Sequence, residues 1–218
     1  IFIPGTGLEA GRQKNTLFPN NAQGDYSICI GSNNTSIGIN SFAGGNSCNA
    51  VGDNSFAFGD TSNAQGINSH SEGSLTTALA PFSHAEGFQT FTNGQNSHAE
   101  GSGSTTGGTN AHAEGEGTTA NGAHSHAEGS LSVAMGDKSH AEGNSCQALA
   151  EGSHAEGIGT VAGTGAITGN AAHAEGVRTQ ALAPASHSQG ADTIAQGENS
   201  HAQNELTLAS GKNSHAGG

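Results

Sequence analysis

The chain has 218 residues, of which 36 are Gly and none is Trp, and its formal net charge at pH 7 is −13. Only 32% of the residues are hydrophobic, so a conventional core of large side chains is excluded and a fold requires a periodic sequence. The acidic charge argues against nucleic acid and anionic membranes as partners, because both favour Lys and Arg. No apolar run approaches the roughly 18 residues of a membrane span, so we expect no membrane insertion.

The first 26 residues differ from the rest of the chain. Residues 1–26 show no period, and we predict that they cap the following domain or connect it to a preceding segment. Residues 27–218 follow a 14-residue period and form the predicted repeat domain. The clearest form of the repeat is NSHAEG at residues 96–101.

The repeat predicts a β-solenoid. A 14-residue unit is too short for a helical hairpin, and its alternation of small and large residues favours two short strands and two tight turns per coil. Stacked coils would pair their equivalent strands in parallel. We number the unit from the Ser before the His. Positions 1, 3, 5, 8, 10 and 12 hold small residues, such as Ser139, Ala141 and Gly143, and are predicted to line the interior of a flat roll.

Cysteine and asparagine fit the same scheme. The cysteines lie at interior positions and are too scattered for a disulfide framework or a zinc site, so we interpret them as small buried residues. They are Cys29, Cys48 and Cys146. Asn recurs just before the motif, as in Asn54 and Asn68, where its tolerance of the left-handed backbone conformation suits a tight turn.

Positions 2 and 4 must point outward from the first strand of each coil. They hold His and Glu in most coils and apolar residues in the first coils, whereas the outward positions 9 and 11 of the second strand vary freely. An exposed apolar stripe implies a covering partner, and an identical chain related by rotation is the simplest one. The predicted seam between chains consists of Ile28, Ile30, Phe42, Phe56, Phe58, His70, Glu72, His84, Glu86, His98, Glu100, His112, Glu114, His126, Glu128, His140, Glu142, His154, Glu156, His173, Glu175, His187, Gln189, His201, Gln203 and His215.

The chemistry of this seam divides the repeat domain. Residues 27–68 form apolar-seam coils, and residues 69–218 form His/Glu-seam coils. The step from His154 to His173 is 19 residues instead of 14, which predicts an insertion near residues 163–167.

The stretches YSICIG, NSFAFG and NSHAEG resemble the head repeat of trimeric autotransporter adhesins, the YadA-like head. Its consensus is an Asn-Ser-Val-Ala-Ile-Gly strand followed by a Ser-x-Ala-x-Gly strand, and the resemblance spans about residues 27–218. It implies an all-β, left-handed parallel β-roll packed as a homotrimer. The SHAEG variant, in which His and Glu replace the apolar pair, also resembles repeats of phage tail-fibre and minor structural proteins.

This resemblance implies a structural or attachment protein, a rigid trimeric fibre or head segment of a phage tail fibre or surface adhesin. Its location would be extracellular, on a virion tail fibre or a bacterial cell surface. The partners would be further copies of the chain and a host-surface receptor or glycan. An alternative is a purely structural extracellular filament subunit without receptor binding.

Paired His and Glu side chains are expected to form hydrogen bonds that link the chains at each coil. We expect Glu to raise the His pKa, with the resulting stability lost as the pH rises through the folded value. A further alternative is a fibre with axial metal ions, each bound by three symmetry-related His side chains. We assign no cofactor, metal ligand or catalytic residue, because many equivalent His–Glu pairs do not form the single asymmetric constellation of an active site.

Overall fold

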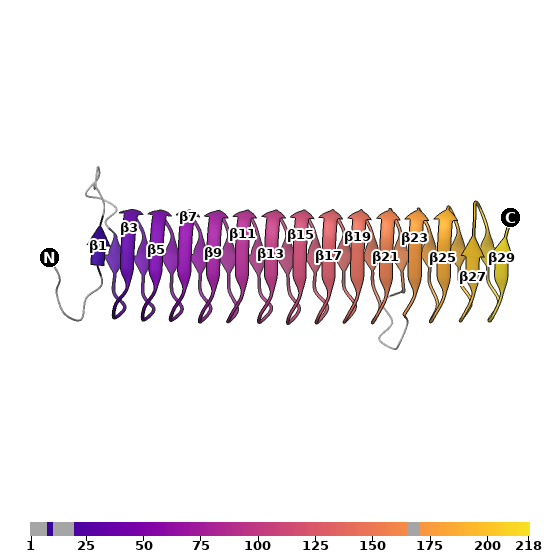
Figure 1. The fold of residues 1–218 in the computed structure, drawn as a ribbon, viewed down its shortest axis with the longest axis horizontal. Helices are drawn as coiled ribbons and strands as arrows, with labels where there is room; N and C mark the ends of the chain where they lie inside the picture. Colours follow the sequence, from indigo (N-terminus) through magenta and orange to yellow (C-terminus); the bar gives the residue numbers. More distant parts are fainter. Residues whose placement is uncertain (1–7, 11–19, 165–170) are drawn as a thin grey trace. The chain divides into compact units, whose positions relative to one another are not determined.

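The computed structural model describes residues 8–10, 20–164 and 171–218, which belong to two compact units, residues 1–106 and 107–218. Each unit consists of short strands and tight turns, and no helix occurs in the described part of the chain (Figure 1). Accordingly, none of these segments is an apolar helix of membrane-spanning length. The predicted parallel β-solenoid is confirmed in both units.

Unit 1 contains two parallel sheets. The odd-numbered strands pair in the order β1-β3-β5-β7-β9-β11-β13, and the even-numbered strands pair from β2 to β14. The strands are β1 (Leu8–Ala10), β2 (Asn21–Ala22), β3 (Ile28–Ser32), β4 (Thr35–Ser36), β5 (Phe42–Asn46), β6 (Asn49–Ala50), β7 (Phe56–Asp60), β8 (Asn63–Ala64), β9 (His70–Ser74), β10 (Thr77–Ala78), β11 (His84–Phe88), β12 (Phe91–Thr92), β13 (His98–Ser102) and β14 (Thr105–Thr106).

Unit 2 repeats this arrangement, with β15 to β29 in one sheet and β16 to β28 in the other. Its strands are β15 (His112–Glu116), β16 (Thr119–Ala120), β17 (His126–Ser130), β18 (Val133–Ala134), β19 (His140–Asn144), β20 (Gln147–Ala148), β21 (His154–Ile158), β22 (Val161–Ala162), β23 (His173–Val177), β24 (Gln180–Ala181), β25 (His187–Ala191), β26 (Ile194–Ala195), β27 (His201–Gln203), β28 (Leu208–Ala209) and β29 (His215–Gly217).

Pairing continues in register across the long repeat step. His154 of β21 pairs with His173 of β23, so the additional residues lie in the connection between β22 and β23. Residues 165–167 of the predicted insertion lie outside the described residues.

Both sheets begin before the predicted repeat domain. In β2, Asn21 pairs with Thr35, one full 14-residue step ahead, and in β1, Leu8 pairs with Ile28. Residues 21–22 therefore follow the register although their sequence was predicted to lie outside it.

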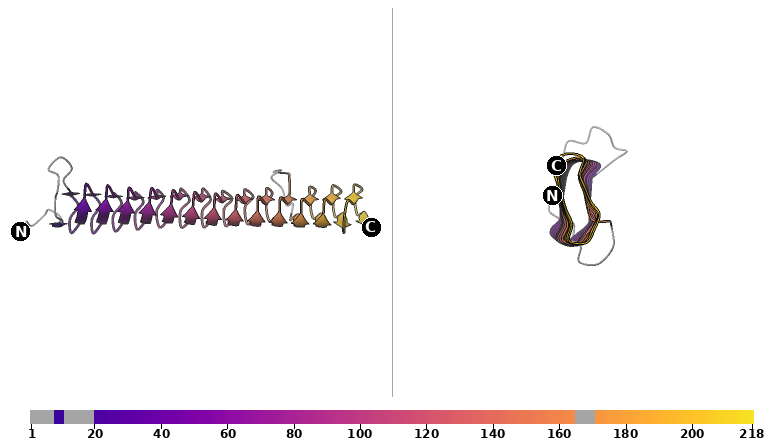
Figure 2. Two further views of the ribbon diagram at one scale, coloured as in Figure 1. Left: turned by 90° about the horizontal axis from the view of Figure 1, so that it is seen from above. Right: turned by 90° about the vertical axis from the view of Figure 1, so that its right-hand side faces the viewer.

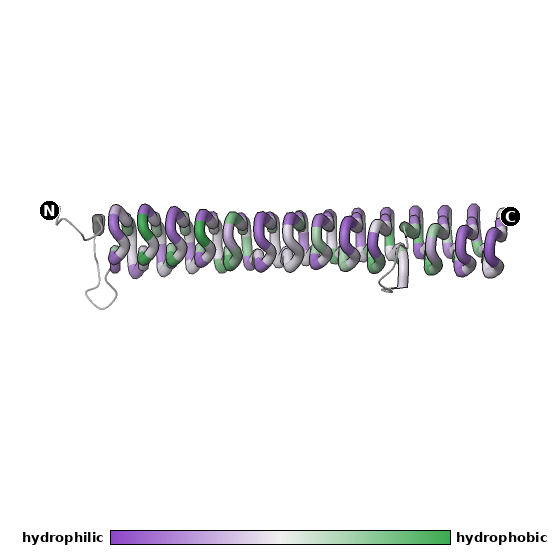
Figure 3. Tube along the Cα trace, turned by 90° about the horizontal axis from the view of Figure 1, so that it is seen from below, coloured by the Kyte–Doolittle hydropathy of each residue, from purple (hydrophilic) through white to green (hydrophobic). Residues whose placement is uncertain are grey.

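Each turn is a flattened ring whose long sides carry the two strands (Figure 2). The interior is formed by small residues: in unit 1, Cys29, Ala43, Ala50 and Ala57 are completely buried. Hydrophobic stretches are short, and hydrophilic or neutral ones separate them along the chain (Figure 3). The three cysteines are buried and reduced, as predicted.

Position 5 differs from the prediction. Its glycines do not line the interior, since Gly73 is half-buried and Gly87 is exposed. Gly73 has a φ of +116°, and a Cβ atom there would lie 2.1 Å from the carbonyl oxygen of Gly87 in the next coil. Glycine is therefore required by the backbone conformation and by the close approach of the next coil, not by the narrow interior.

The predicted left-handed conformation at position 14 is confirmed, with φ values of 56° at both Asn54 and Asn68. Position 7, at the opposite turn, is also left-handed and accepts residues such as Leu75 (φ 60°) and Arg178 (φ 53°). Both turns of a coil thus depend on a left-handed residue, although Asn recurs mainly at position 14.

Candidate functional site

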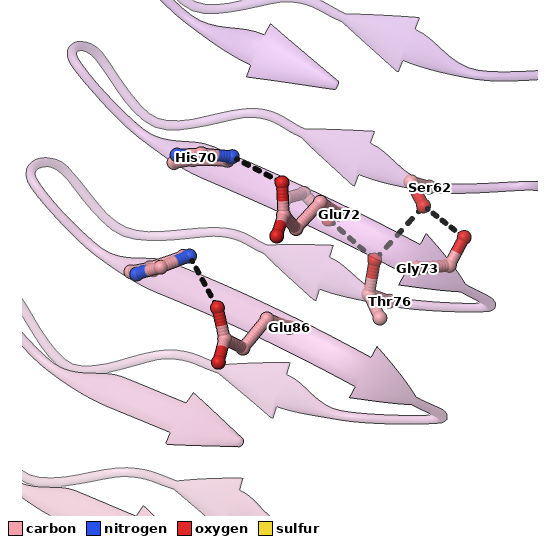
Figure 4. A network of polar contacts seen from close by, with 8 residues as sticks. Ser62, His70, Glu72, Gly73, Thr76 and Glu86 are labelled. Carbon is pink, nitrogen blue, oxygen red and sulfur yellow. Dashed lines mark hydrogen bonds and ion pairs between the residues drawn. The ribbon is translucent and has the colours of Figure 1, made fainter. Parts of the chain in front are cut away.

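The outward side chains at positions 2 and 4 form one face in each unit, which we call the first-strand face. All the residues of the predicted seam are at these positions of β3 to β29, and the buried residue at position 3 separates each pair. In β9, for example, His70 and Glu72 lie on the outer side, while the buried residues Ser62 and Thr76, which directly precede β8 and β10, lie on the inner side of the roll (Figure 4). The side-chain directions predicted from the period are therefore correct.

The first coils of unit 1 have an aromatic and aliphatic face. The rings of Phe42 and Phe56 stack with centroids 5.0 Å apart, and Phe58 lies 6.2 Å from Phe56. Ile30 and Phe58 are 45% and 49% exposed. Large apolar side chains thus remain in contact with water on a single chain, which marks a surface suited to a partner.

The histidines of the later coils stack on one another. In unit 1, His70 and His84 have ring centroids 4.5 Å apart. In unit 2, the centroid distances from His112 to His215 are between 4.8 and 5.0 Å, and most ring pairs are within a few degrees of parallel. This stacking follows from parallel pairing at a constant register, because equivalent residues of adjacent strands lie side by side.

From His70 to His173, the histidines of the face also lie beside the glutamate of their own coil. The distance from Nε2 to Oε2 is 3.3 Å for His70 and Glu72 and 3.4 Å for His84 and Glu86 (Figure 4). In unit 2, the corresponding distance is 3.4 Å for His154 and Glu156. His and Glu of one coil thus lie close together within a chain, whereas the predicted hydrogen bonds between chains stay a prediction.

The Nε2 atom of several stacked imidazoles is buried. Nε2 of His84, His126 and His154 is buried and lacks a hydrogen bond of good geometry within the chain, although a carboxylate is near. The same atoms are buried in His140, His173, His187 and His201. These polar atoms can accept or donate a further bond.

Burial lowers the pKa of several of these histidines. The pKa of His84 falls to about 4, first because the ring is desolvated and then because His70 and His98 lie beside it. The pKa values of His126, His187 and His201 are lowered for the same leading reason, desolvation. The prediction that Glu raises the His pKa was therefore wrong for these residues, because burial in the stack outweighs the attraction of the carboxylates.

The carboxylates are affected by the stack as well. The pKa of Glu128 is raised, mainly by desolvation and then by the neighbouring carboxylates of Glu142 and Glu114. The His140 ring acts in the opposite direction and is the weakest of these influences. Like charges along the face therefore disfavour full ionisation.

Sets of two histidines and one glutamate could hold a metal ion. Five such triplets occur in the described part of the chain, and in each the ligand atoms lie within 4.8 Å of one another. They are His84–Glu86–His98, His112–Glu114–His126, His140–Glu142–His154, His154–Glu156–His173 and His173–Glu175–His187. No triplet was predicted within one chain, although the repeat spacing of adjacent His residues was a signal for it.

Interior hydrogen-bond donors at position 8 were also missed. The Oγ atom of Ser132 donates to the carbonyl oxygen of Gly143 at 3.2 Å, and the Nδ2 atom of Asn34 donates to that of Gly45 at 3.0 Å. Position 8 therefore connects adjacent coils as well as filling the interior. The signal was the recurrence of Ser, Thr, Asn and Cys there, in contrast to Ala at position 10.

Comparison with known proteins supports the predicted resemblance. The family model for the YadA head domain repeat matches residues 50–69, 108–125 and 127–145, in both units. No curated protein matches the chain.

Proposed function

Because the chain carries YadA-like head repeats, we propose that it forms a rigid homotrimeric segment of an extracellular fibre, as a left-handed β-roll that projects from a phage tail or a bacterial surface. The head-repeat family has a structural and adhesive role and is not a family of enzymes. Its adhesins are trimeric and exposed at the cell surface. The proposed partners of this chain are therefore two further copies of itself and a host-surface receptor or glycan.

The first-strand face carries this proposal. Its first coils expose Ile30 and Phe58, and its later coils repeat His with Glu or Gln, whereas the second-strand positions vary freely. When three chains associate around a threefold axis, each presents the same face to the axis, so one stripe per chain is sufficient. Burial of the exposed area of Ile30 and Phe58 would favour association by the hydrophobic effect.

The His–Glu coils would continue the same seam. A carboxylate buried at a seam needs a hydrogen-bond donor, and the imidazole of another chain can supply one. The buried Nε2 atoms of His126 and His154 lack such a bond within the chain. We propose that His–Glu hydrogen bonds between chains fix the relative register of the three copies.

The experiment is the mass in solution, measured by size-exclusion chromatography with light scattering at neutral pH. We expect three times the chain mass of 21.4 kDa. Phe58→Asp places a charge on the first-strand face and should dissociate the trimer. Phe91→Asp is the matched control, because Phe91 is also a partly exposed strand residue but lies on the second strand. A monomeric wild-type chain, or equal effects of both substitutions, would refute the proposed seam.

Adhesion is tested separately from assembly. The trimer is expected to bind host cells or immobilised surface glycans in a saturable manner. A trimer that binds none of these surfaces would support the alternative of a purely structural filament subunit. Axial metal ions bound by three chains are a distinct alternative, which requires that chelators dissociate the trimer.

A further inference from the structure

The first-strand face of unit 2 brings metal ligands of a single chain together, independently of any second chain. Strands β19, β21, β23 and β25 place three overlapping sets of two imidazoles and one carboxylate side by side. We propose that this face binds divalent transition-metal ions of the Zn²⁺ type, each held by the His and Glu of one coil and the His of the next. The triplets are His140–Glu142–His154, His154–Glu156–His173 and His173–Glu175–His187.

The His and Glu of one coil are already spaced as two ligands of one ion. Tetrahedral zinc with bonds of about 2.0–2.2 Å requires its ligand atoms to lie roughly 3.4 Å apart. The distance from Nε2 of His154 to Oε2 of Glu156 is 3.4 Å, and it is 3.6 Å for His140 and Glu142. Two of the three protein ligands therefore need almost no movement.

The imidazole nitrogens that face these carboxylates are unsatisfied. Nε2 of His140, His154, His173 and His187 is buried and has no hydrogen-bond partner within the chain. A buried polar atom without a partner costs free energy, so a ligand that satisfies it binds more favourably. In the tautomer that carries its proton on Nδ1, Nε2 presents a lone pair to a metal ion.

The second imidazole of each triplet has to tilt. The rings of His154 and His173 are 4.8 Å apart and within 3° of parallel, so their lone pairs point in the same direction. Their side chains are about one-third exposed, at 34% and 36%, which leaves room for rotation toward the outer side. Binding therefore exchanges a ring stack for a metal–nitrogen bond.

The donor set decides the class of ion. Two imidazoles and one carboxylate suit zinc, nickel and copper ions, with water completing the coordination, whereas calcium and magnesium prefer oxygen ligands throughout. The coil that carries Gln189 lacks the carboxylate and forms no triplet with His201 among the described residues. The metal-binding part of the face thus ends where Gln replaces Glu.

Sharing of ligands sets the stoichiometry. The central triplet shares His154 with one neighbour and His173 with the other, so it cannot be filled together with them. The triplets His84–Glu86–His98 in unit 1 and His112–Glu114–His126 in unit 2 share no residue with these three and have the same donor set. Four of the five triplets among the described residues therefore have no residue in common and can be occupied at once. We therefore expect at most four ions per chain.

The test is calorimetric titration of the metal-free full chain with zinc chloride, together with the absorption spectrum of bound cobalt(II). Saturable binding of up to four ions per chain is expected, with the spectrum of tetrahedral cobalt. The double substitution Glu142→Gln/Glu175→Gln removes the carboxylate of both triplets that flank the central one, so the central triplet becomes available. The number of ions bound per chain should therefore fall from four to three, and adding Glu156→Gln should lower it to two. The charge-matched control is Glu116→Gln/Glu151→Gln/Glu198→Gln, which changes partly or fully exposed carboxylates outside the triplets and should leave the number of bound ions unchanged.

Several outcomes would overturn the inference. These are the absence of saturable binding, an equal loss of ions in the charge-matched control, and uptake of one ion per three chains, which would indicate axial sites. Light scattering on the same samples separates this inference from the proposed trimer. Zinc binding by a monomer would support the triplets and refute the seam, whereas a trimer without zinc binding would refute the triplets alone.

Discussion

Phe56 packs edge-on against His70, with ring centroids 4.7 Å apart, at the point where the first-strand face changes from apolar residues to histidine. On its other side, Phe56 stacks on Phe42. The aromatic stack thus continues from the apolar coils into the His coils of unit 1 without interruption. The two kinds of coil can therefore follow one another on one backbone, because a phenyl ring and an imidazole ring occupy equivalent places in the stack.

Replacement of Phe56 by Ala removes its ring contacts with Phe42, Phe58 and His70. Aromatic pairs contribute about 0.5–1.5 kcal/mol each beyond the area they bury, so the loss of three pairs should lower the free energy of unfolding by about 1.5–4.5 kcal/mol. Urea denaturation followed by circular dichroism measures this change. Phe91→Ala is the control, since Phe91 is a partly exposed residue of the second strand, and an equal effect there would contradict the role of the stack.

Acid should destabilise the metal-free protein. The pKa of His84 is lowered from 6.5 to about 4, so the unfolded chain takes up a proton at a higher pH than the folded one. The contribution of His84 to the free energy of unfolding is fully present above pH 6.5 and is lost as the pH falls toward about 4. His126, His187 and His201 act in the same direction. The raised pKa of Glu128 acts in the opposite direction, but a single carboxylate should not outweigh the combined effect of the four histidines on stability.

Thermal unfolding in the presence of EDTA, measured across this pH range, tests the sign. The unfolding midpoint should fall on acidification, and His84→Asn should make the dependence shallower. His124→Asn is the control, because His124 occupies an exposed turn outside the stack, in a left-handed conformation that Asn accepts. A midpoint that rises on acidification would show that the carboxylates dominate.

Gly73→Ala should be strongly destabilising. A residue with a side chain is strained at a φ of +116°, and the new Cβ atom would lie 2.1 Å from the carbonyl oxygen of Gly87. Backbone strain of this kind costs about 1–3 kcal/mol, and relief of the clash would separate the two coils further. Gly211→Ala is the comparison, since its nearest neighbour would be at 3.6 Å and its φ is not positive. Similar unfolding midpoints for the two variants would refute this explanation.

The strand positions could be predicted because the period and the side-chain pattern agree. His70 begins β9 and Phe56 begins β7, as the 14-residue register required. The outward direction of positions 2 and 4 followed from the small residues between them. The interior position predicted for Gly73 was wrong, because glycine satisfies both a narrow interior and a positive φ, and the sequence alone does not distinguish these requirements.

The electrostatics of the face could be predicted only in part. The pairing of His84 with Glu86 followed from their spacing. The lowered pKa of His84 did not, because it arises from burial beneath the neighbouring rings, which depends on the stacking geometry. Asn21, which pairs with Thr35, was also missed, because backbone pairing at the start of the sheets does not require the side-chain motif. Trimerisation stays a prediction that the mass in solution tests.

Cys146 allows the role of position 8 to be tested with two substitutions of the same shape. Its Sγ atom donates to the carbonyl oxygen of Gly157 at 3.2 Å, and Ser132 makes the equivalent bond one coil earlier. Thr keeps a donor at this position, whereas Val has the same shape without one. We therefore expect Cys146→Thr to be more stable than Cys146→Val by about 1 kcal/mol, the usual net contribution of a hydrogen bond. Chemical denaturation of both variants measures the difference, and equal stability would mean that position 8 selects for size alone, as the sequence first indicated.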